Sequence, residues 1–462
     1  MAYIFYDVET TGTRTAFDQI LQFAAIKTDD DLNVVETFNI RCRLLPYVVP
    51  APGALLVTGT TIADITTCPV SHFEMMRQVH AKMHHWSQGG AIFIGWNSIR
   101  FDEKLLRQAY YQTLLPVYQT NTAGNGRADM MRMARVVTAC APNVISVPLQ
   151  ADGKRTFKLS LVAAANNVAL NNAHDALADT GATLGVARLI KQRAPALWDA
   201  LILNARKSGV LKLFQDNNPV LLLSEHFSNV PSNHVVTVIA RNLDNQNEWA
   251  ACDLQFDPAR YLDASDDDLR AAIDGPLQVI RRVSVNSQPG LLPINFAPED
   301  VQGGRLSMEM YQARTKTIRE HATFRKRISH LLAGRFTDRA ESIHIEEQLY
   351  CGFPSNSDQT HMNSFQRHDW DNRIGVIKDI EDRRYRQFGR RIIASERPDL
   401  LTAEQRLRWK SWCRSRLLCN EDVPWMTVSS ALEEISRLEE DADPDRRYQL
   451  SELECFIKRM EH

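Results

Sequence analysis

Short apolar runs and longer amphipathic stretches alternate along the first part of the chain. Runs of four to ten mostly apolar residues are typical of strands, whereas apolar residues three and four apart, such as Leu105/Ala109 and Leu106/Tyr110, are typical of a helix. Proline and glycine at 46–53 interrupt the pattern as a loop. The sequence therefore predicts an α/β domain with strands at residues 3–6, 21–27, 34–43 and 91–95 and helices at residues 103–115 and 176–194.

The pattern changes twice after that domain. Between residues 200 and 300, β-branched runs at 220–223, 235–239 and 279–283 are separated by polar turns, which favours a small β-rich barrel or sandwich. From about residue 298 onward the chain is charged and helical, and no repeat or low-complexity linker separates the parts. A chain of 462 residues is too long for one core, so we expect three abutting domains at residues 1–195, 196–300 and 301–462.

Composition narrows the class of protein without deciding its function. The proportions, 44% hydrophobic and 24% charged residues, are ordinary for a globular protein. The N-terminus lacks the basic start and cleavage site of a secretory signal, and no apolar run approaches the roughly 20 residues of a membrane helix. We therefore expect a soluble, cytoplasmic protein. The net charge of −2 gives no hint of a nucleic-acid partner, although a near-neutral total can hide a basic groove beside an acidic site.

The eight cysteines are scattered, with no C-x-x-C pair among them. This spacing argues against a zinc ribbon and against a disulfide framework. We expect reduced structural thiols.

The first candidate motif, Asp7-Val8-Glu9-Thr10-Thr11-Gly12, directly follows the first predicted strand. Side chains two apart on a strand share a face, so Asp7 and Glu9 should point to the same side. Two such carboxylates repel each other unless a cation lies between them, as in a magnesium site. Gly12 would allow a tight turn. Taken alone, the fragment is also compatible with two solvated acids at a strand end.

Two further acidic motifs follow. Asp102 stands between a predicted strand and a predicted helix, where a helix N-cap is the simplest explanation. His174 precedes a helix whose first turns contain Asp179. Because five positions correspond to about 140° of helical rotation, these two side chains converge only if His174 lies on the preceding loop. A single loop histidine is more often an ordinary surface residue.

In combination, these residues resemble the DnaQ-like family of 3′→5′ exonucleases, in the branch with the motifs D-x-E, D and H-x-x-x-x-D. Asp7, Glu9, Asp102, His174 and Asp179 occupy those positions in the family's order. Over nearly its whole length the chain is also similar to the bacterial exodeoxyribonuclease I group. The strings that carry this similarity are at residues 23–26, 52–59, 100–102, 172–176, 178–179, 298–300 and 348–353.

The resemblance implies a fold and a chemistry. The fold is an RNase H-like (DnaQ-like) α/β nuclease domain with a mixed sheet, followed by an SH3-like β domain and a C-terminal helical domain. Asp7, Glu9, Asp102 and Asp179 would hold two divalent ions, with Asp7 bridging them and Asp102 assisting the second ion, while His174 would be the general base. An oxygen-rich ligand set favours Mg²⁺, with Mn²⁺ as a substitute, over zinc.

The similarity also suggests where a strand would be held. The positions are Glu9, Arg107, Tyr118, Arg135, Lys158 and Asn172. Lys158 replaces the arginine of the family, which keeps a charge contact but loses a bidentate one. Residues 376–416 carry 12 Lys or Arg against 6 Asp or Glu, interleaved with Tyr385, Phe388, Trp409 and Trp412. That interleaving is typical of a single-strand groove, and equally of amphipathic helices that bury aromatic residues and expose arginines.

The resulting hypothesis is a metal-dependent 3′→5′ exonuclease that hydrolyses single-stranded DNA to nucleoside 5′-monophosphates and works as a monomer. An exoribonuclease remains the alternative, because the same centre serves both nucleic acids. A non-catalytic strand-binding or proofreading subunit is a third hypothesis. Members of the family can bind single-strand-binding protein. That partner is less expected here, because small or uncharged residues replace the family's aromatic, basic or amide groups at Ala200, Asn218, Pro293 and Ala297.

Overall fold

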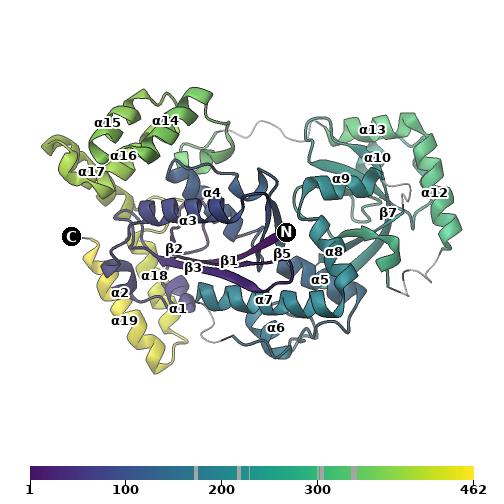
Figure 1. Ribbon diagram of the computed structural model, residues 1–462, viewed down its shortest axis with the longest axis horizontal. Coiled ribbons are helices and arrows are strands. Elements are labelled where there is room, and N and C mark those ends of the chain that lie inside the picture. Colours follow the sequence, from purple (N-terminus) through teal and green to yellow (C-terminus); the bar gives the residue numbers. More distant parts are fainter. Residues whose placement is uncertain are drawn as a thin grey trace.

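The computed structural model describes residues 1–170, 175–215, 220–227, 229–298, 301, 306–333 and 341–461. Two five-stranded sheets lie side by side, and helices near the C-terminus cover the far side of the first sheet (Figure 1). The N-terminal part of the chain is therefore flanked on both sides by later segments.

The first sheet has the strand order β3-β2-β1-β4-β5. Strand β1 pairs antiparallel with β2 and parallel with β4, which is parallel to β5, so the sheet is mixed, as the family resemblance implies. The four predicted strands are present, and β5 is an additional short strand. Their bounds are β1 Ala2–Thr10, β2 Ile20–Thr28, β3 Val34–Arg41, β4 Ala91–Gly95 and β5 Gly126–Asp129.

Helices cover both faces of this sheet. Ile4 and Tyr6 of β1 pack among residues of α3 (His72–Trp86) and α4 (Asp102–Gln112). Tyr3 and Phe5 point the other way, into a core with α5 (Met130–Cys140), α7 (Ala176–Arg193) and α8 (Pro195–Leu203). Because side chains alternate along a strand, the next odd-numbered residues, Asp7 and Glu9, share the face that α7 covers.

The second sheet is antiparallel, in the order β10-β6-β7-β8-β9. Three of its strands contain the predicted β-branched runs. The bounds are β6 Leu221–Phe227, β7 Val230–Arg241, β8 Glu248–Asp253, β9 Ile280–Ser284 and β10 Leu291–Pro293, with helices α9 Lys207–Gln215 and α10 Asp266–Asp274 beside them.

Helices α12 (Met308–Glu320) and α13 (Ala322–Leu332) pack against β7, and Phe324 and Ile328 join the same core as Val235 of that strand. The sequence analysis assigned these helices to the third domain. Because their apolar faces are buried against the second sheet, we propose that the boundary between the second and third domains follows α13.

The helices near the C-terminus lie on the other side of the first sheet from the second sheet (Figure 1), whereas α6 packs against α7. Helices α18 and α19 pack against α1, and α19 also packs against α2. The loop predicted at residues 46–53 ends where α1 begins at Pro52. Within the described residues, no helix is both long and apolar enough to cross a membrane. All eight cysteines are free, as expected. The bounds are α1 Pro52–Thr58, α2 Ile62–Thr67, α6 Leu159–Ala165, α14 Asn356–Arg367, α15 Trp370–Asp379, α16 Arg383–Glu396, α17 Ala403–Leu417, α18 Val428–Glu439 and α19 Pro444–Arg459.

Candidate active site

Three carboxylates meet at the end of β1. Asp7, Glu9 and Asp179 each place one oxygen within 4.8 Å of the others'. The strand alternation sends Asp7 and Glu9 to the same side, where α7 brings Asp179 in its first turn. Gly12 follows with an ordinary φ rather than a left-handed one. A Cβ there would stand 2.6 Å from the carboxylate of Asp18, so glycine is needed for this close approach.

Asp175 fixes the helix that carries Asp179. Its carboxylate caps α7 by accepting hydrogen bonds from the backbone N–H groups of Leu177 (3.0 Å) and Ala178 (3.3 Å). The other oxygen accepts from Gln22 of β2 and pairs with Arg41 of β3 at 2.8 Å. The sequence analysis did not identify this role. An Asp immediately before a helix is an N-cap signal that could have revealed it.

Asp102 joins the group from a different element. It is the first residue of α4, only 3% exposed, and its carboxylate accepts a hydrogen bond from the backbone N–H of Val8 in β1. Among the acidic neighbours that raise the pKa of Asp7, it has the largest effect. Asp102 is thus not the N-cap that the sequence suggests, since Phe101 occupies that position; instead, α4 places Asp102 against the strand that holds the other carboxylates.

The raised pKa values of these carboxylates show that their ionised forms repel one another. Burial, followed by repulsion from Asp179 and Asp102, raises the pKa of Glu9 from 4.5 to about 8. Burial is also the largest cause that raises the pKa of Asp102 to about 7, and it raises that of Asp7 well above its ordinary value. Carboxylates this close fit a divalent ion with oxygen ligands, such as Mg²⁺ or Mn²⁺.

Two of the predicted site residues, His174 and Asn172, lie outside the described residues. The roles assigned to them from the resemblance stay predictions.

Arg107 is held by a buried carboxylate that the sequence analysis did not single out. Its guanidinium lies 2.8 Å from Glu103, which is 2% exposed and also accepts hydrogen bonds from Thr120 and Arg127. The guanidinium lies 5.0 Å from the ring centroid of Tyr118. Arg107 is therefore held between Glu103 and the ring of Tyr118. No pattern in the sequence distinguishes Glu103 from an ordinary helical glutamate.

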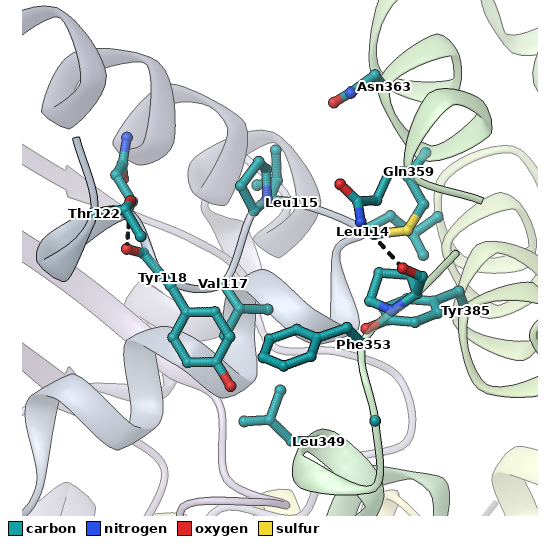
Figure 2. A pocket seen from close by; sticks show the side chains of 15 residues that line it. Leu114, Leu115, Val117, Tyr118, Thr122, Leu349, Phe353, Gln359, Asn363 and Tyr385 are labelled. Carbon is teal, nitrogen blue, oxygen red and sulfur yellow. Dashed lines mark hydrogen bonds between the residues drawn. The ribbon is translucent and has the colours of Figure 1, made fainter. Parts of the chain in front are cut away.

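Tyr118 borders an apolar cavity of about 240 Å³ between the first domain and the C-terminal helices. Figure 2 shows Tyr118, Val117 and Phe353 beside one another, with Leu349 and Tyr385 further along the wall. The Tyr118 and Phe353 ring centroids are 5.8 Å apart, and Phe353 is 79% exposed. The predicted contact residue thus belongs to an aromatic wall formed by two domains.

Arg135 and Lys158 lie on the other side of the first domain. Arg135 stacks over Phe157 at 5.3 Å and donates a hydrogen bond to Asn229 near the tip of the β6–β7 hairpin. Lys158 is exposed and precedes α6. Arg135 therefore lies where the first domain approaches the second sheet.

The basic segment 376–416 differs from the predicted strand groove. Tyr385 and Phe388 are 2% and 1% exposed and form part of a core. Arg384 is also buried, and its guanidinium binds Asp382 and the carbonyls of Gln348 and Gly352. The alternative of a structural, amphipathic helix is therefore right for these residues.

Arg391 and Arg416 of this segment both pair with Glu346, at 2.8 and 3.0 Å. Arg416 also lies 4.3 Å from the ring centroid of Trp425 and 5.7 Å from that of Phe17, which belongs to the β1–β2 connection. This buried group of charges and rings joins the C-terminal helices to the catalytic domain.

The sequence analysis argued against single-strand-binding protein as a partner from four positions, and the structure describes three of them. Ala200 lies on α8, Pro293 ends β10 and Ala297 is 5% exposed. Asn218 lies outside the described residues. None of the three offers a charged or amide group to a partner.

Comparison with known proteins agrees with this architecture. Residues 4–187 match the family model described as Exonuclease. Residues 205–334 match the Exonuclease I SH3-like domain, and residues 343–460 match the Exonuclease I C-terminal domain. The fold is therefore a DnaQ-like nuclease domain followed by an SH3-like domain and a helical domain, as predicted.

Individual relatives extend over nearly the whole chain. The exodeoxyribonuclease I of Haemophilus influenzae is 28% identical over 432 residues, 90% of each chain. A solved exonuclease I from Methylocaldum szegediense is 27% identical with a TM-score of 0.83 and covers 100% of both chains. E. coli exonuclease I in complex with a dT13 oligonucleotide is 25% identical, with a TM-score of 0.83 and 99% of each chain covered. This protein is a 3′→5′ exonuclease, and the chain belongs to the exodeoxyribonuclease I family.

Proposed function

We propose that this exonuclease removes nucleotides from the 3′ end of single-stranded DNA as nucleoside 5′-monophosphates, using two divalent ions. The observation that carries the proposal is the meeting of Asp7, Glu9 and Asp179 within 4.8 Å, with Asp102 buried beside them. The dT13 complex of the E. coli relative supports single-stranded DNA as the substrate.

Each residue then has a part in the reaction. Asp7, Glu9 and Asp179 would hold one ion, Asp7 would also serve as a ligand of a second ion, and Asp102 would assist that second ion. Two divalent ions, when bound, lower the pKa of the attacking water and neutralise charge on the phosphate. His174 accepts the proton of that water. Asp175 and Arg41 act indirectly, because they position the helix that carries Asp179.

The substrate is positioned by groups on both sides of the carboxylates. Glu9, Arg107, Tyr118, Arg135, Lys158 and Asn172 contact the strand. Tyr118 supplies a face for a nucleobase, which does not depend on sequence, while Arg135 and Lys158 supply positive charge for phosphates. Among the possible ions we propose Mg²⁺, with Mn²⁺ as a substitute.

One experiment tests these points together. Single-stranded DNA, duplex DNA and RNA, each labelled at the 3′ or the 5′ end, are incubated with the protein with and without Mg²⁺. We expect loss of the 3′ label first, only on single-stranded DNA and only with the ion. Faster digestion of RNA would favour the exoribonuclease alternative. Equal activity of Asp7→Ala and parental protein would refute the assigned centre.

A further inference from the structure

The carboxylate of Glu103 is buried at the start of α4, directly after Asp102 in the sequence, and is 2% exposed. Four side chains donate hydrogen bonds to it, which are Arg107 (2.8 Å), Arg127 (3.2 Å) and Thr120 (2.6 Å) to Oε1 and Tyr6 (3.3 Å) to Oε2. Glutamate is almost never fully buried unless it is paired, and a carboxylate taken out of water needs such donors. The fold therefore builds a specific place for this one side chain.

The two arginines that share Glu103 lead to different parts of the molecule. Arg127, on β5, also donates to the carbonyl of Asn286 beside the second sheet, at 3.0 Å. Arg107 contacts the hydroxyl of Tyr350 in the C-terminal part of the chain and lies against the ring of Tyr118. One buried carboxylate thus connects the nuclease domain with both of the later domains.

The orientation of Arg107 depends on Glu103. Its Nε and one terminal nitrogen both lie 2.8 Å from Oε1 of Glu103, so the plane of the guanidinium is fixed from one edge. The side chains of Arg107 and Arg127 are only 13% and 11% exposed, and among the described residues Glu103 is the one carboxylate within ion-pair distance of either. Without this charge, two buried cations would lack a counter-ion and would repel each other.

Tyr118 depends on Glu103 at one remove. The Arg107 guanidinium lies 5.0 Å from the centroid of its ring, and the neighbouring Phe353 belongs to the C-terminal part (Figure 2). A planar guanidinium stacks on an aromatic ring in a defined orientation. A rotation of Arg107 would therefore change the surface that Tyr118 presents.

We propose that Glu103 is a positioning residue, which holds Arg107, and through it the ring of Tyr118, in the orientation that binds the single strand. The proposal rests on the proposed function, in which Arg107 and Tyr118 contact the strand. Glu103 itself does not contact the strand, because its oxygens are occupied by protein donors. A carboxylate near phosphates repels them. Simple electrostatics therefore predicts tighter strand binding when this charge is removed, and positioning predicts the opposite.

The test compares two glutamates that have the same spacing from an arginine. Glu103→Gln keeps the size of the side chain and one acceptor oxygen but removes the charge that both arginines share. The matched control is Glu404→Gln, since Glu404 also stands four residues before its arginine, Arg408, and both side chains are exposed. Binding of a fluorescent oligothymidylate is measured by anisotropy in EDTA, which prevents turnover, and KM and kcat are measured with Mg²⁺.

We expect Glu103→Gln to weaken strand binding about tenfold or more, the range for a lost hydrogen bond to a charged group. KM should rise by a similar factor and kcat should stay within about threefold, because the strand is held equally in the ground state and the transition state. Glu103→Asp keeps the charge on a shorter side chain and should restore part of the affinity. The control should stay within about twofold of the parental protein, since an exposed pair contributes little.

A double-substitution cycle shows whether Glu103 acts through Arg107. In protein that already carries Arg107→Gln, adding Glu103→Gln should weaken binding little further, because residues that act together are not additive. Circular dichroism checks that each variant is folded, and Glu103→Asp replaces Glu103→Gln in the cycle if the latter does not fold.

Tighter or unchanged binding in Glu103→Gln would overturn the proposal, as would losses that add fully in the double variant. A fall in kcat with an unchanged KM would also overturn it, because Glu103 would then act on its neighbour Asp102 instead of on the strand contacts. The proposed function is judged separately, by digestion of labelled strands with the parental protein, and stands if Glu103 has no such role.

Discussion

The carboxylate cluster should take up protons when metal is removed and release them when metal binds. With a pKa of about 8, Glu9 is about nine-tenths protonated at pH 7 in the metal-free protein, and Asp102, with a pKa of about 7, is about half protonated. Mg²⁺ binds the ionised forms. More than one proton should therefore leave per site at pH 7, and the number should fall by about one at pH 9.

The raised pKa of Glu9 also makes the stability of the metal-free fold depend on pH. Because the folded-state pKa of Glu9 lies above its ordinary value of 4.5, the folded protein keeps a proton that the unfolded chain releases between about pH 4.5 and pH 8. The metal-free fold should lose stability as the pH rises through that window. The rise of the Glu9 pKa from 4.5 to about 8 corresponds to a loss of about 5 kcal/mol of folding stability as an upper limit. Mg²⁺ should restore stability most strongly at the alkaline end.

Calorimetric titration with Mg²⁺ in two buffers of different ionisation enthalpy measures the released protons directly. Glu9→Gln should release about one proton fewer at pH 7, whereas Glu404→Gln on the exposed face of α17 should match the parental protein. The midpoint of thermal unfolding in EDTA provides a second measurement. Proton release that is constant from pH 6 to 9, or equal in Glu9→Gln and parental protein, would refute the electrostatic argument.

Three other variants test other parts of the molecule. His174→Ala should lower turnover by about 10² to 10⁴ without weakening strand binding, and should abolish any limb of the pH–rate profile near neutrality. Glu346→Gln leaves two buried arginines unpaired and should destabilise the C-terminal part by about 3–5 kcal/mol, measured by urea unfolding through Trp425 fluorescence. Neutralising the accessible Arg383 and Arg386 should flatten the salt slope of long-strand binding by about 0.7 per phosphate contact; an unchanged slope would show that neither contacts the strand.

Much of the first domain could be predicted from the sequence because its signals are local. The strands at residues 3–6 and 91–95 are continuous apolar runs, and the strand alternation alone places Asp7 and Glu9 on one side. The residues around Asp102 and Asp179 in the sequence do not show that these two side chains approach Asp7 and Glu9. That approach depends on how α4 and α7 pack on opposite faces of the sheet, and only the family resemblance anticipated it.

Alternatives stayed open where only the burial of side chains could decide between them. The aromatic and basic residues of 376–416 fit a strand groove and an amphipathic helix equally well, and only packing shows that Tyr385, Phe388 and Arg384 are buried. Glu103 and Glu346 could not be singled out either, because their burial and their pairing with Arg127 and Arg391 depend on segments that are distant along the chain. A buried glutamate and a solvated one look alike in a sequence.

The net charge, too, cannot show where the charges lie in the structure. The total of −2 is the sum of positive and negative groups that the fold separates in space. Four carboxylates gather at the end of β1, while three arginines line a cavity between the first domain and the second sheet. Each group is unfavourable by itself, since burial and like charges raise the pKa values of the carboxylates and lower those of Arg132 and Arg135. A strand with divalent ions at its 3′ end and phosphates upstream would neutralise both groups at once. Substrate and ions should therefore stabilise the protein more together than the sum of their separate effects, because each ion reduces the repulsion between the acidic cluster and the phosphate beside it.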